Sequence, residues 1–289
     1  MVYLPLKKLT YFKKYLLSYK IYRLKNIFLI KFFFLKITFL GTGTSTGIPF
    51  IGSKHPVCLS NDSKDKRLRA SVKIDINNST LIIDCGPDFR QQMINSNCDH
   101  IDAIIFSHEH ADHTAGLDDI RPFCFKQGPI PIYAHNRVLK NLSKRFEYIF
   151  NENHKYPGAP SVYSNEIIPN KSFEINDIKI TPISYMHAKL QVYGFRIYDF
   201  AYVTDLKTID NQEIEKLKNL EVLVLNAIRI EKHFSHLNLK EALDLISLIK
   251  PKKVFLTHIS HLLGFHTEVS KDLPENVYLS YDGLVIETN

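Results

Sequence analysis

The segment Ser107–His113 gathers three histidines and two carboxylates within seven residues, directly after a short apolar run. Neutral imidazole nitrogens and carboxylate oxygens are ligands that Zn²⁺ and similar divalent ions accept. A strand that ends in a tight loop can direct several such groups at one point. His108 and His110 alternate to one side, while Asp112 and His113 could hold a second ion beside the first. The segment therefore predicts a metal centre rather than a solvent-facing polar loop.

Polar side chains of the same types close other apolar runs farther along the chain. They are Asp84, His187, Asp205 and His258. Residues at strand ends on one edge of a sheet can be directed into one cleft by a rigid scaffold. Any one of them could be a structural residue at the edge of the core, but their joint occurrence favours a single site.

The elements that must position these residues follow from apolar runs and turn signals. We expect strands at 37–40, 71–75, 81–84, 103–106, 130–134, 173–175, 178–183, 194–198, 200–204, 221–226, 254–256, 277–279 and 284–286. We expect helices at 87–96, 116–125, 137–150, 211–219 and 238–248, a last helix near the C-terminus, and a loop at 151–163. No linker divides residues 36–289, which predicts one domain.

The charge of the chain is concentrated at its N-terminus. The 289 residues carry a formal charge of +7, but residues 1–36 hold nine Lys and Arg and no acidic residue. The remainder has 28 basic and 30 acidic side chains, a net charge of −2. The charge distribution therefore does not favour a broad basic surface for binding nucleic acid.

Residues 1–35 form a basic N-terminal extension in which Lys31 interrupts the most apolar part, so a membrane span is not expected. It could be a membrane-surface or targeting segment, a protein-specific arm, or translated sequence upstream of the native start. We favour the last, which would make the extension non-native or disordered. Four cysteines without C-x-x-C spacing do not indicate a disulfide scaffold, and a cytoplasmic location is the simpler expectation.

The segment 107–113, together with the downstream His187, Asp205 and His258, resembles the motif of the metallo-β-lactamase superfamily. The signature of that superfamily is His-x-His-x-Asp-His with downstream His, Asp and His. The resemblance covers about residues 36–289 and implies an α+β fold, a four-layer αββα sandwich. It also implies two divalent ions, Zn²⁺ in the first place and Mn²⁺ as the alternative. The first ion would take His108, His110 and His187, and the second would take Asp112, His113 and His258. Asp205 would bridge both ions, and Asp84 would orient the ligands.

Within that superfamily, the Gly/Thr/Ser loop 41–49 and the segments 256–261 and 281–283 resemble the branch of cyclic-phosphate phosphodiesterases and ribonuclease Z enzymes. That branch has a further catalytic histidine, which His236 matches. We therefore expect catalytic roles for His236, Asp112 and Asp84, with Arg67, Arg69 or Arg121 available to neutralise a phosphate. The branch often carries a structural zinc held by cysteines. Here Ser53 and His55 replace two of them, so a third zinc on His55, Cys58 and His261, with His266 as a further donor, is an alternative to loss of that site.

The implied function is a binuclear metal-dependent hydrolase, a phosphodiesterase for a small or cyclic phosphate ester. The alternatives are a thioester or lactone hydrolase of the same fold, a tRNA 3′-processing endonuclease, and a non-catalytic metal-binding protein. The expected partner is a small phosphorylated substrate. Nucleic acid is not favoured, no transmembrane segment is expected, and a homodimer is allowed.

Overall fold

The computed structural model describes residues 34–151, 153 and 155–288, so the interpretations of segment 1–33 lie outside the described residues. Residues Leu35–Thr288 form one compact unit. Its first strand begins at Leu35, whose side chain is buried. Among the described residues, no helix is long and apolar enough to span a membrane.

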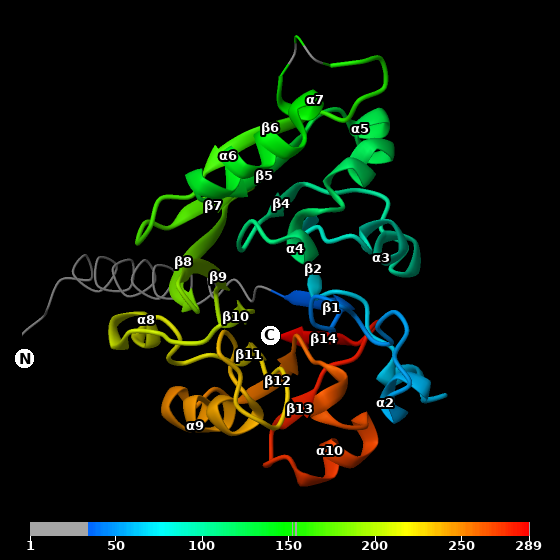
Figure 1. The fold of residues 1–289 in the computed structure, drawn as a ribbon. Coiled ribbons are helices and arrows are strands. Elements are labelled where there is room, and N and C mark those ends of the chain that lie inside the picture. Colours follow the sequence, from blue (N-terminus) through cyan, green and yellow to red (C-terminus); the bar gives the residue numbers. More distant parts are fainter. Residues whose placement is uncertain (1–33, 152, 154, 289) are drawn as a thin grey trace, which may run out of the picture. The chain divides into compact units, whose positions relative to one another are not determined.

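The first sheet has seven strands, antiparallel at one side and parallel at the other (Figure 1). In spatial order they are β14 (Val285–Thr288), β1 (Leu35–Gly41), β2 (Ser71–Ile76), β3 (Ser79–Ile83), β4 (Ala103–Ile105), β5 (Ile130–Ala134) and β6 (Val162–Glu166). Strands β14 to β3 pair antiparallel, and β3 to β6 pair parallel. Strands β2 and β3 form a hairpin. Its turn contains Asn77 and Asn78 at positive φ, a conformation that asparagine tolerates.

The second sheet mirrors this arrangement with seven further strands. In spatial order they are β13 (Val277–Leu279), β12 (Lys253–Thr257), β11 (Val222–Asn226), β10 (Phe200–Val203), β9 (Leu190–Ile197), β8 (Ile178–His187) and β7 (Phe173–Ile175). Strands β13 to β10 are parallel, and β10 to β7 are antiparallel. The fully buried β11 has the apolar composition expected of a central parallel strand.

Helices connect the strands and cover the outer faces of the sheets. They are α2 (Pro56–Leu59), α3 (Phe89–Asn95), α4 (Ala111–Thr114), α5 (Arg121–Gln127), α6 (Asn136–Arg145), α7 (Glu147–Phe150), α8 (Asn211–Glu215), α9 (Leu239–Ile249) and α10 (His266–Asp272). Short 3-10 helices of the described residues include Ser63–Asp65, Leu117–Ile120 and His261–Leu263. Helix α9 begins at a reciprocal capping box between Asn238 and Glu241.

Two apolar clusters hold the layers together. One packs α3, α5 and α6 on the first sheet, with Phe89 and Leu142 fully buried among strand residues. The other packs α8 and α9 on the second sheet, where Leu217 and Ala242 are fully buried. The architecture is therefore the expected α+β sandwich of two sheets with helices outside.

Several predicted elements differ from the observed ones. The helix expected at 116–125 is a 3-10 helix, Leu117–Ile120, followed by α5, and the helix expected at 211–219 ends at Glu215. The helix expected at 137–150 is two helices, because Phe146 leaves the helical region with φ −123° and ψ 48°. Strand β8 extends to His187, because its polar end pairs with β9 through Leu190. Strand β6 falls partly in the expected loop 151–163, since its side chains are mostly exposed and lack an apolar alternation.

Candidate metal centre

The predicted site residues lie together at the ends of strands from both sheets. Asp84 follows β3, and the segment Ser107–His113 follows β4 in the first sheet. Asp205 and His258 follow the parallel strands β10 and β12 of the second sheet, and His187 ends β8. Since parallel strands end at a common edge, short apolar strands here deliver polar side chains to one place.

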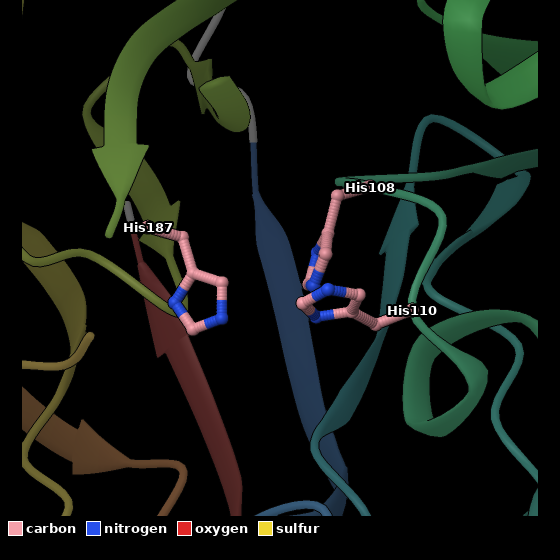
Figure 2. A group of neighbouring side chains, drawn as sticks. All are labelled: His108, His110 and His187. Atoms are coloured by element: carbon pink, nitrogen blue, oxygen red, sulfur yellow. The ribbon is translucent and has the colours of Figure 1, made fainter. Parts of the chain in front are cut away.

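The first donor group consists of His108, His110 and His187, which converge in Figure 2 from opposite sheets. Their ligand atoms lie within 4.8 Å of one another. The ring centroids of His108 and His110 are 4.5 Å apart, and those of His110 and His187 are 5.2 Å apart. His108 and His187 are buried, whereas His110 is exposed, so the group is open on one side.

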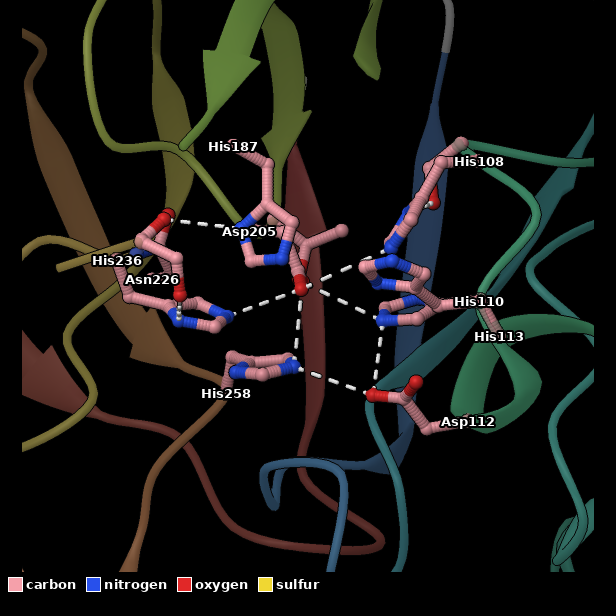
Figure 3. Close-up of polar contacts among 12 residues, drawn as sticks. His108, His110, Asp112, His113, His187, Asp205, Asn226, His236 and His258 are labelled. Carbon is pink, nitrogen blue, oxygen red and sulfur yellow. Dashed lines mark hydrogen bonds and ion pairs between the residues drawn. The ribbon is translucent and has the colours of Figure 1, made fainter. Parts of the chain in front are cut away.

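The second donor group consists of Asp112, His113, Asp205 and His258, again with ligand atoms within 4.8 Å of one another. His113 Nε2 lies 3.2 Å from Asp112 Oδ2, and His258 Nε2 lies 3.2 Å from Asp205 Oδ1. The rings of His113 and His258 are parallel within 8°. Figure 3 shows these side chains surrounding one small space.

Asp205 faces both donor groups with different oxygens. Its Oδ1 lies 3.4 Å from His113 Nε2 in the second donor group. Its Oδ2 lies 3.9 Å from His108 Nε2 in the first donor group. Thr204 donates a hydrogen bond of 2.7 Å to Oδ1, which orients the carboxylate. The side chain therefore stands where a bridging ligand would stand.

Asp84 is fully buried and fixes the orientation of two histidines. It accepts the Ser107 backbone N–H at 2.8 Å, the Ser107 hydroxyl at 2.8 Å and His113 Nδ1 at 2.7 Å. Because the Ser107 hydroxyl donates to Asp84, its oxygen is left to accept from His108 Nδ1 at 3.0 Å. Both imidazoles thus present Nε2 to the donor groups, as metal-binding histidines do.

The donor set fits divalent cations, because several buried nitrogens are unsatisfied. Within the described part of the chain, Nε2 of His108, His113 and His258 have no hydrogen-bond partner. Orphaned buried polar atoms are rare and call for an unseen partner such as an ion. His187 donates Nδ1 to the Ser235 carbonyl at 2.9 Å, so its Nε2 is also available.

The electrostatics of the centre also favour the binding of cations. Burial alone would lower the pKa of His113, but the carboxylates of Asp112, Asp205 and Asp84 raise it well above its ordinary value. Burial lowers the pKa of His108 well below its usual value. Burial works to raise the pKa of Asp205, yet His258 and His113 hold it well below its ordinary value. Three carboxylates, those of Asp84, Asp112 and Asp205, therefore act on His113, and this concentration of acidic groups favours cations.

His236 approaches the centre from the loop between β11 and α9. Its Nε2 lies 3.0 Å from Asp205 Oδ2, and its Nδ1 lies 3.0 Å from the Ser235 hydroxyl. Burial lowers the pKa of His236 to about 4, against the opposing effect of Asp205. Together with His187 and Asp205 it forms a third set of converging donors, so geometry allows either a ligand or a catalytic role.

The backbone of the centre is held in unusual conformations. Asp84, Asp205 and His258 have φ of 66°, 60° and 55°, in the left-handed region that costs non-glycine residues about 1–3 kcal/mol each. Such strain is typical of residues that a functional site holds in place. Gly86 allows close packing here, since a Cβ would lie 2.1 Å from the Asp112 carbonyl oxygen.

Sequence reasoning missed several supporting residues. Asn226 is fully buried at the end of β11, where it accepts from Leu206 N at 2.7 Å and donates to Leu206 O at 3.1 Å. This fixes the chain directly after Asp205. Asn226 carries the same signal as the predicted residues, a polar side chain closing an apolar run, and could have been found by it. Ser107 also closes an apolar run, whereas Ser235 gives no such signal.

Other charged residues near the motif have different partners. Glu109, which received no ligand role, forms an ion pair of 2.7 Å with Arg137. Arg67 is buried and donates to Thr42, to the Ser280 carbonyl and to His266. Arg69 pairs with Asp88 at 3.0 Å, and Arg121 pairs with Asp118 at 2.7 Å. All three arginines considered for phosphate binding are therefore engaged elsewhere in the structure.

The donors considered for a third zinc are only partly gathered. The rings of His55 and His261 are in edge contact with centroids 4.8 Å apart. His55 Nδ1 accepts the Val57 backbone N–H at 3.3 Å as the cap of α2, and Cys58 is a buried free thiol. Among the described residues, the sets of three or more converging donors do not include them.

Comparisons with known proteins agree with this geometry. A family model described as a beta-lactamase superfamily domain matches residues 79–259. A curated octanoyltransferase of Porphyromonas gingivalis is 39% identical over 247 residues, or 85% of this chain, which spans only about half (50%) of that protein.

Two solved structures are also similar to this chain. A diphosphatase from the PhnP family is 35% identical with a TM-score of 0.82, covering 88% of this chain and 97% of that one. Human tRNase Z, short form, shares the fold with 18% identity and a TM-score of 0.63, over 87% of this chain and 98% of that one. The sequence likeness is thus to a PhnP-family diphosphatase, and the likeness to tRNase Z is one of fold. The family model covers more than half of the chain and spans the donor segments from Asp84 to His258, so the chain belongs to the metallo-β-lactamase superfamily of metal-dependent hydrolases.

Proposed function

We propose that this chain is a binuclear metal-dependent phosphodiesterase that hydrolyses a small or cyclic phosphate ester. The observation that carries the proposal is the position of Asp205 between two donor groups, with one carboxylate oxygen toward each. Three histidines would hold one ion, and Asp112, His113 and His258 would hold the other. Zn²⁺ is the expected ion, with Mn²⁺ as the alternative, because mixed His and Asp sites accept both.

Two bound divalent ions would lower the pKa of a water towards ~7 and neutralise charge on phosphate oxygens. The chain's own residues supply the rest. Asp84, through Ser107, keeps the Nε2 atoms of His108 and His113 directed at the centre. The exposed side of His110 leaves an approach for substrate.

His236 is the proposed acid of the reaction. Its Nε2 is held against Asp205 Oδ2, while Ser235 contacts the opposite nitrogen, so the ring cannot turn freely. Because burial lowers the pKa of His236 to about 4, the ring is mainly neutral near pH 7 and donates a hydrogen bond from Nε2 to the leaving alkoxide oxygen. The protonated fraction, which grows as the pH falls, can also transfer a proton to that oxygen. General acids positioned in this way contribute about 10²–10⁴-fold to rate.

The phosphate ester is favoured over the two alternatives by separate observations. The PhnP-family diphosphatase matches at 35% identity over almost its whole length, which supports phosphate chemistry. A tRNA substrate would require a basic surface, whereas residues 37–289 carry a net charge of −2. The octanoyltransferase match keeps an octanoyl thioester as the second candidate substrate, although the chain spans only half of that protein.

The test combines metal analysis with three substrates. The purified chain, supplied separately with Zn²⁺ and Mn²⁺, is assayed on bis(p-nitrophenyl) phosphate, an octanoyl thioester and a pre-tRNA. We expect about two ions per chain and hydrolysis of the phosphate diester. Fewer than one ion per chain would contradict the binuclear centre. If the thioester is turned over faster than the phosphate diester, the proposed phosphodiesterase function is contradicted and the thioester hydrolase is favoured.

A further inference from the structure

The loop between β11 and α9 exposes an aromatic side chain beside the proposed acid. Phe234 is 80% exposed, directly before Ser235 and His236, which are both buried. Single exposed apolar residues are common and need no explanation by themselves. Phe234 is distinguished by its connection to the centre, because it stands on the same short segment that touches both donor groups.

Neighbouring rings connect Phe234 to the proposed acid. The Phe234 ring lies on the His233 ring, with centroids 4.8 Å apart and planes inclined by 30°. The His233 ring is 5.1 Å from the His236 ring, whose Nε2 contacts Asp205. One face of Phe234 is therefore supported, and the exposed remainder of the ring lies one imidazole away from the proposed acid.

The segment is held firmly around this ring. Ser235 donates its backbone N–H to His233 Nδ1 at 3.3 Å, and its hydroxyl lies 3.2 Å from the same nitrogen. The Ser235 carbonyl accepts from His187 at 2.9 Å, which ties the loop to the first donor group. An aromatic surface fixed in advance loses little freedom when a ligand settles on it.

Polar contacts also fix the outer part of the loop. Asn238 donates its side-chain amide to the Ile230 carbonyl at 2.8 Å, and Leu239 donates its backbone N–H to the Arg229 carbonyl at 2.9 Å. Arg229 donates to the carbonyls of Glu231 and Lys232 at 3.2 and 2.6 Å, which shapes the tip. These contacts make the loop an ordered platform.

We propose that Phe234 is a stacking platform that selects phosphate esters carrying a planar aromatic group, such as a nucleobase, next to the scissile phosphate. The inference rests on the proposed function for the position of that phosphate. The phosphate would lie at the two donor groups and the aromatic group would lie on Phe234, with His236 between them at the ester oxygen. Stacking of a base on an aromatic side chain is sequence-tolerant, because every base has a π face.

A fluorescence experiment tests binding without any need for turnover. The chain contains no tryptophan, so Phe234→Trp places a single reporter on the platform. Phe125→Trp is the matched control, because Phe125 is also exposed, at 68%, but lies on α5 outside the first sheet. Each metal-loaded variant is titrated with adenosine 5′-monophosphate and with ribose 5-phosphate, which lacks the base.

The expected result is quenching of Phe234→Trp by adenosine 5′-monophosphate, with little response to ribose 5-phosphate and none in Phe125→Trp. Equal responses to both phosphates would show that only the phosphate is recognised and would overturn the proposal. Equal quenching in both variants, or no quenching in either, would also overturn it. These outcomes stand whether or not the chain proves to be a phosphodiesterase.

A kinetic experiment tests selection. Adenosine 2′,3′-cyclic phosphate and ribose 2,3-cyclic phosphate share the cyclic ester and the sugar but differ in the aromatic base. Phe234→Ala should lower the ratio of their kcat/KM values by about 10-fold, Phe234→Trp should retain it, and Phe125→Ala should leave it unchanged. An unchanged ratio in Phe234→Ala would contradict the platform. Failure of the wild-type chain to cleave either ester would contradict the proposed function instead, leaving the fluorescence result in force.

Sedimentation tests whether a second copy of the chain, rather than an aromatic ligand, covers Phe234. If the wild type is a dimer and Phe234→Ala is a monomer, then Phe234 is a subunit contact and the platform is overturned. We expect both proteins to have the same oligomeric state.

Discussion

Asp84 Oδ2 and His113 Nδ1 lie 2.7 Å apart, and both side chains are almost completely buried. The contact determines which imidazole nitrogen remains for the second donor group. Through Ser107, the same carboxylate also sets the orientation of His108 in the first donor group. One aspartate therefore organises a histidine of each group.

Asp84→Asn should weaken metal binding without removing any proposed ligand. Asparagine tolerates the left-handed backbone at this position, but it lacks the charge and the second acceptor oxygen. We expect a 10–100-fold loss of metal affinity, the usual effect of removing such a supporting contact. Competition with a chromophoric chelator measures it, and Asp244→Asn, an exposed change on α9, is the control. Unchanged affinity would show that Asp84 has no such role.

The two donor groups should lose their ions differently. His187 belongs to the first donor group, so His187→Ala should leave about one ion per chain after dialysis. Asp205 faces both groups, so Asp205→Asn should lower occupancy of both, to below about one ion. His100→Ala, a surface histidine, should retain the wild-type content. Identical losses in the His187 and Asp205 variants would contradict the bridging position.

His236→Ala should separate catalysis from metal binding. With the proposed acid removed, kcat on bis(p-nitrophenyl) phosphate should fall by about 10²–10⁴-fold while the metal content stays at the wild-type level. His100→Ala again serves as the control. Because His236 also converges with His187 and Asp205, loss of an ion in this variant would make it a ligand instead.

Most of the centre could be predicted from the sequence because its residues obey one local rule. Short apolar runs form buried parallel strands, and the polar residue that closes each run is delivered to the common edge. This rule identified Asp84, Asp205 and His258 at positions far apart in the chain. The spacing within residues 107–113 predicted the remaining members of the second donor group, Asp112 and His113. It also predicted two members of the first donor group, His108 and His110.

The remaining features depend on contacts between distant segments, which local patterns do not encode. The role of Ser235 arises only because its carbonyl meets His187 across the fold. Arg67 is attractive for phosphate binding by type, but burial against Thr42 and His266 gives it a structural role. Strand β6 was missed because backbone pairing with β5, rather than apolar side chains, holds it in the sheet.

Asn226→Ala should destabilise the protein and weaken the centre together. The side chain satisfies both backbone groups of Leu206, the residue after Asp205, in a fully buried position. Leaving them unpaired should lower the free energy of unfolding by about 2–4 kcal/mol. Urea denaturation measures this loss, and chelator competition measures the accompanying loss of metal affinity. Asn95→Ala, on the exposed face of α3, should change neither quantity, and equal behaviour of the two variants would contradict the role of Asn226.

A buried histidine outside the centre should make stability depend on pH. Arg67 Nη2 lies 3.1 Å from His266 Nδ1, a contact that requires this nitrogen to be unprotonated. Burial, reinforced by the charge of Arg67, lowers the pKa of His266 to about 4 from its ordinary 6.5.

Between these two pKa values the unfolded chain binds more protons than the folded chain, so the free energy of unfolding falls as the pH falls from about 6.5 towards 4. Urea denaturation at pH 7 and pH 5 measures the fall, and His266→Gln removes the titrating group. We expect the wild type to lose on the order of 1 kcal/mol more than His266→Gln over this interval, after allowance for solvent screening. Comparing the two proteins cancels the contribution that carboxylates titrating in both make to the change in the free energy of unfolding. Equal losses would show that His266 is protonated as readily in the folded chain as in the unfolded one.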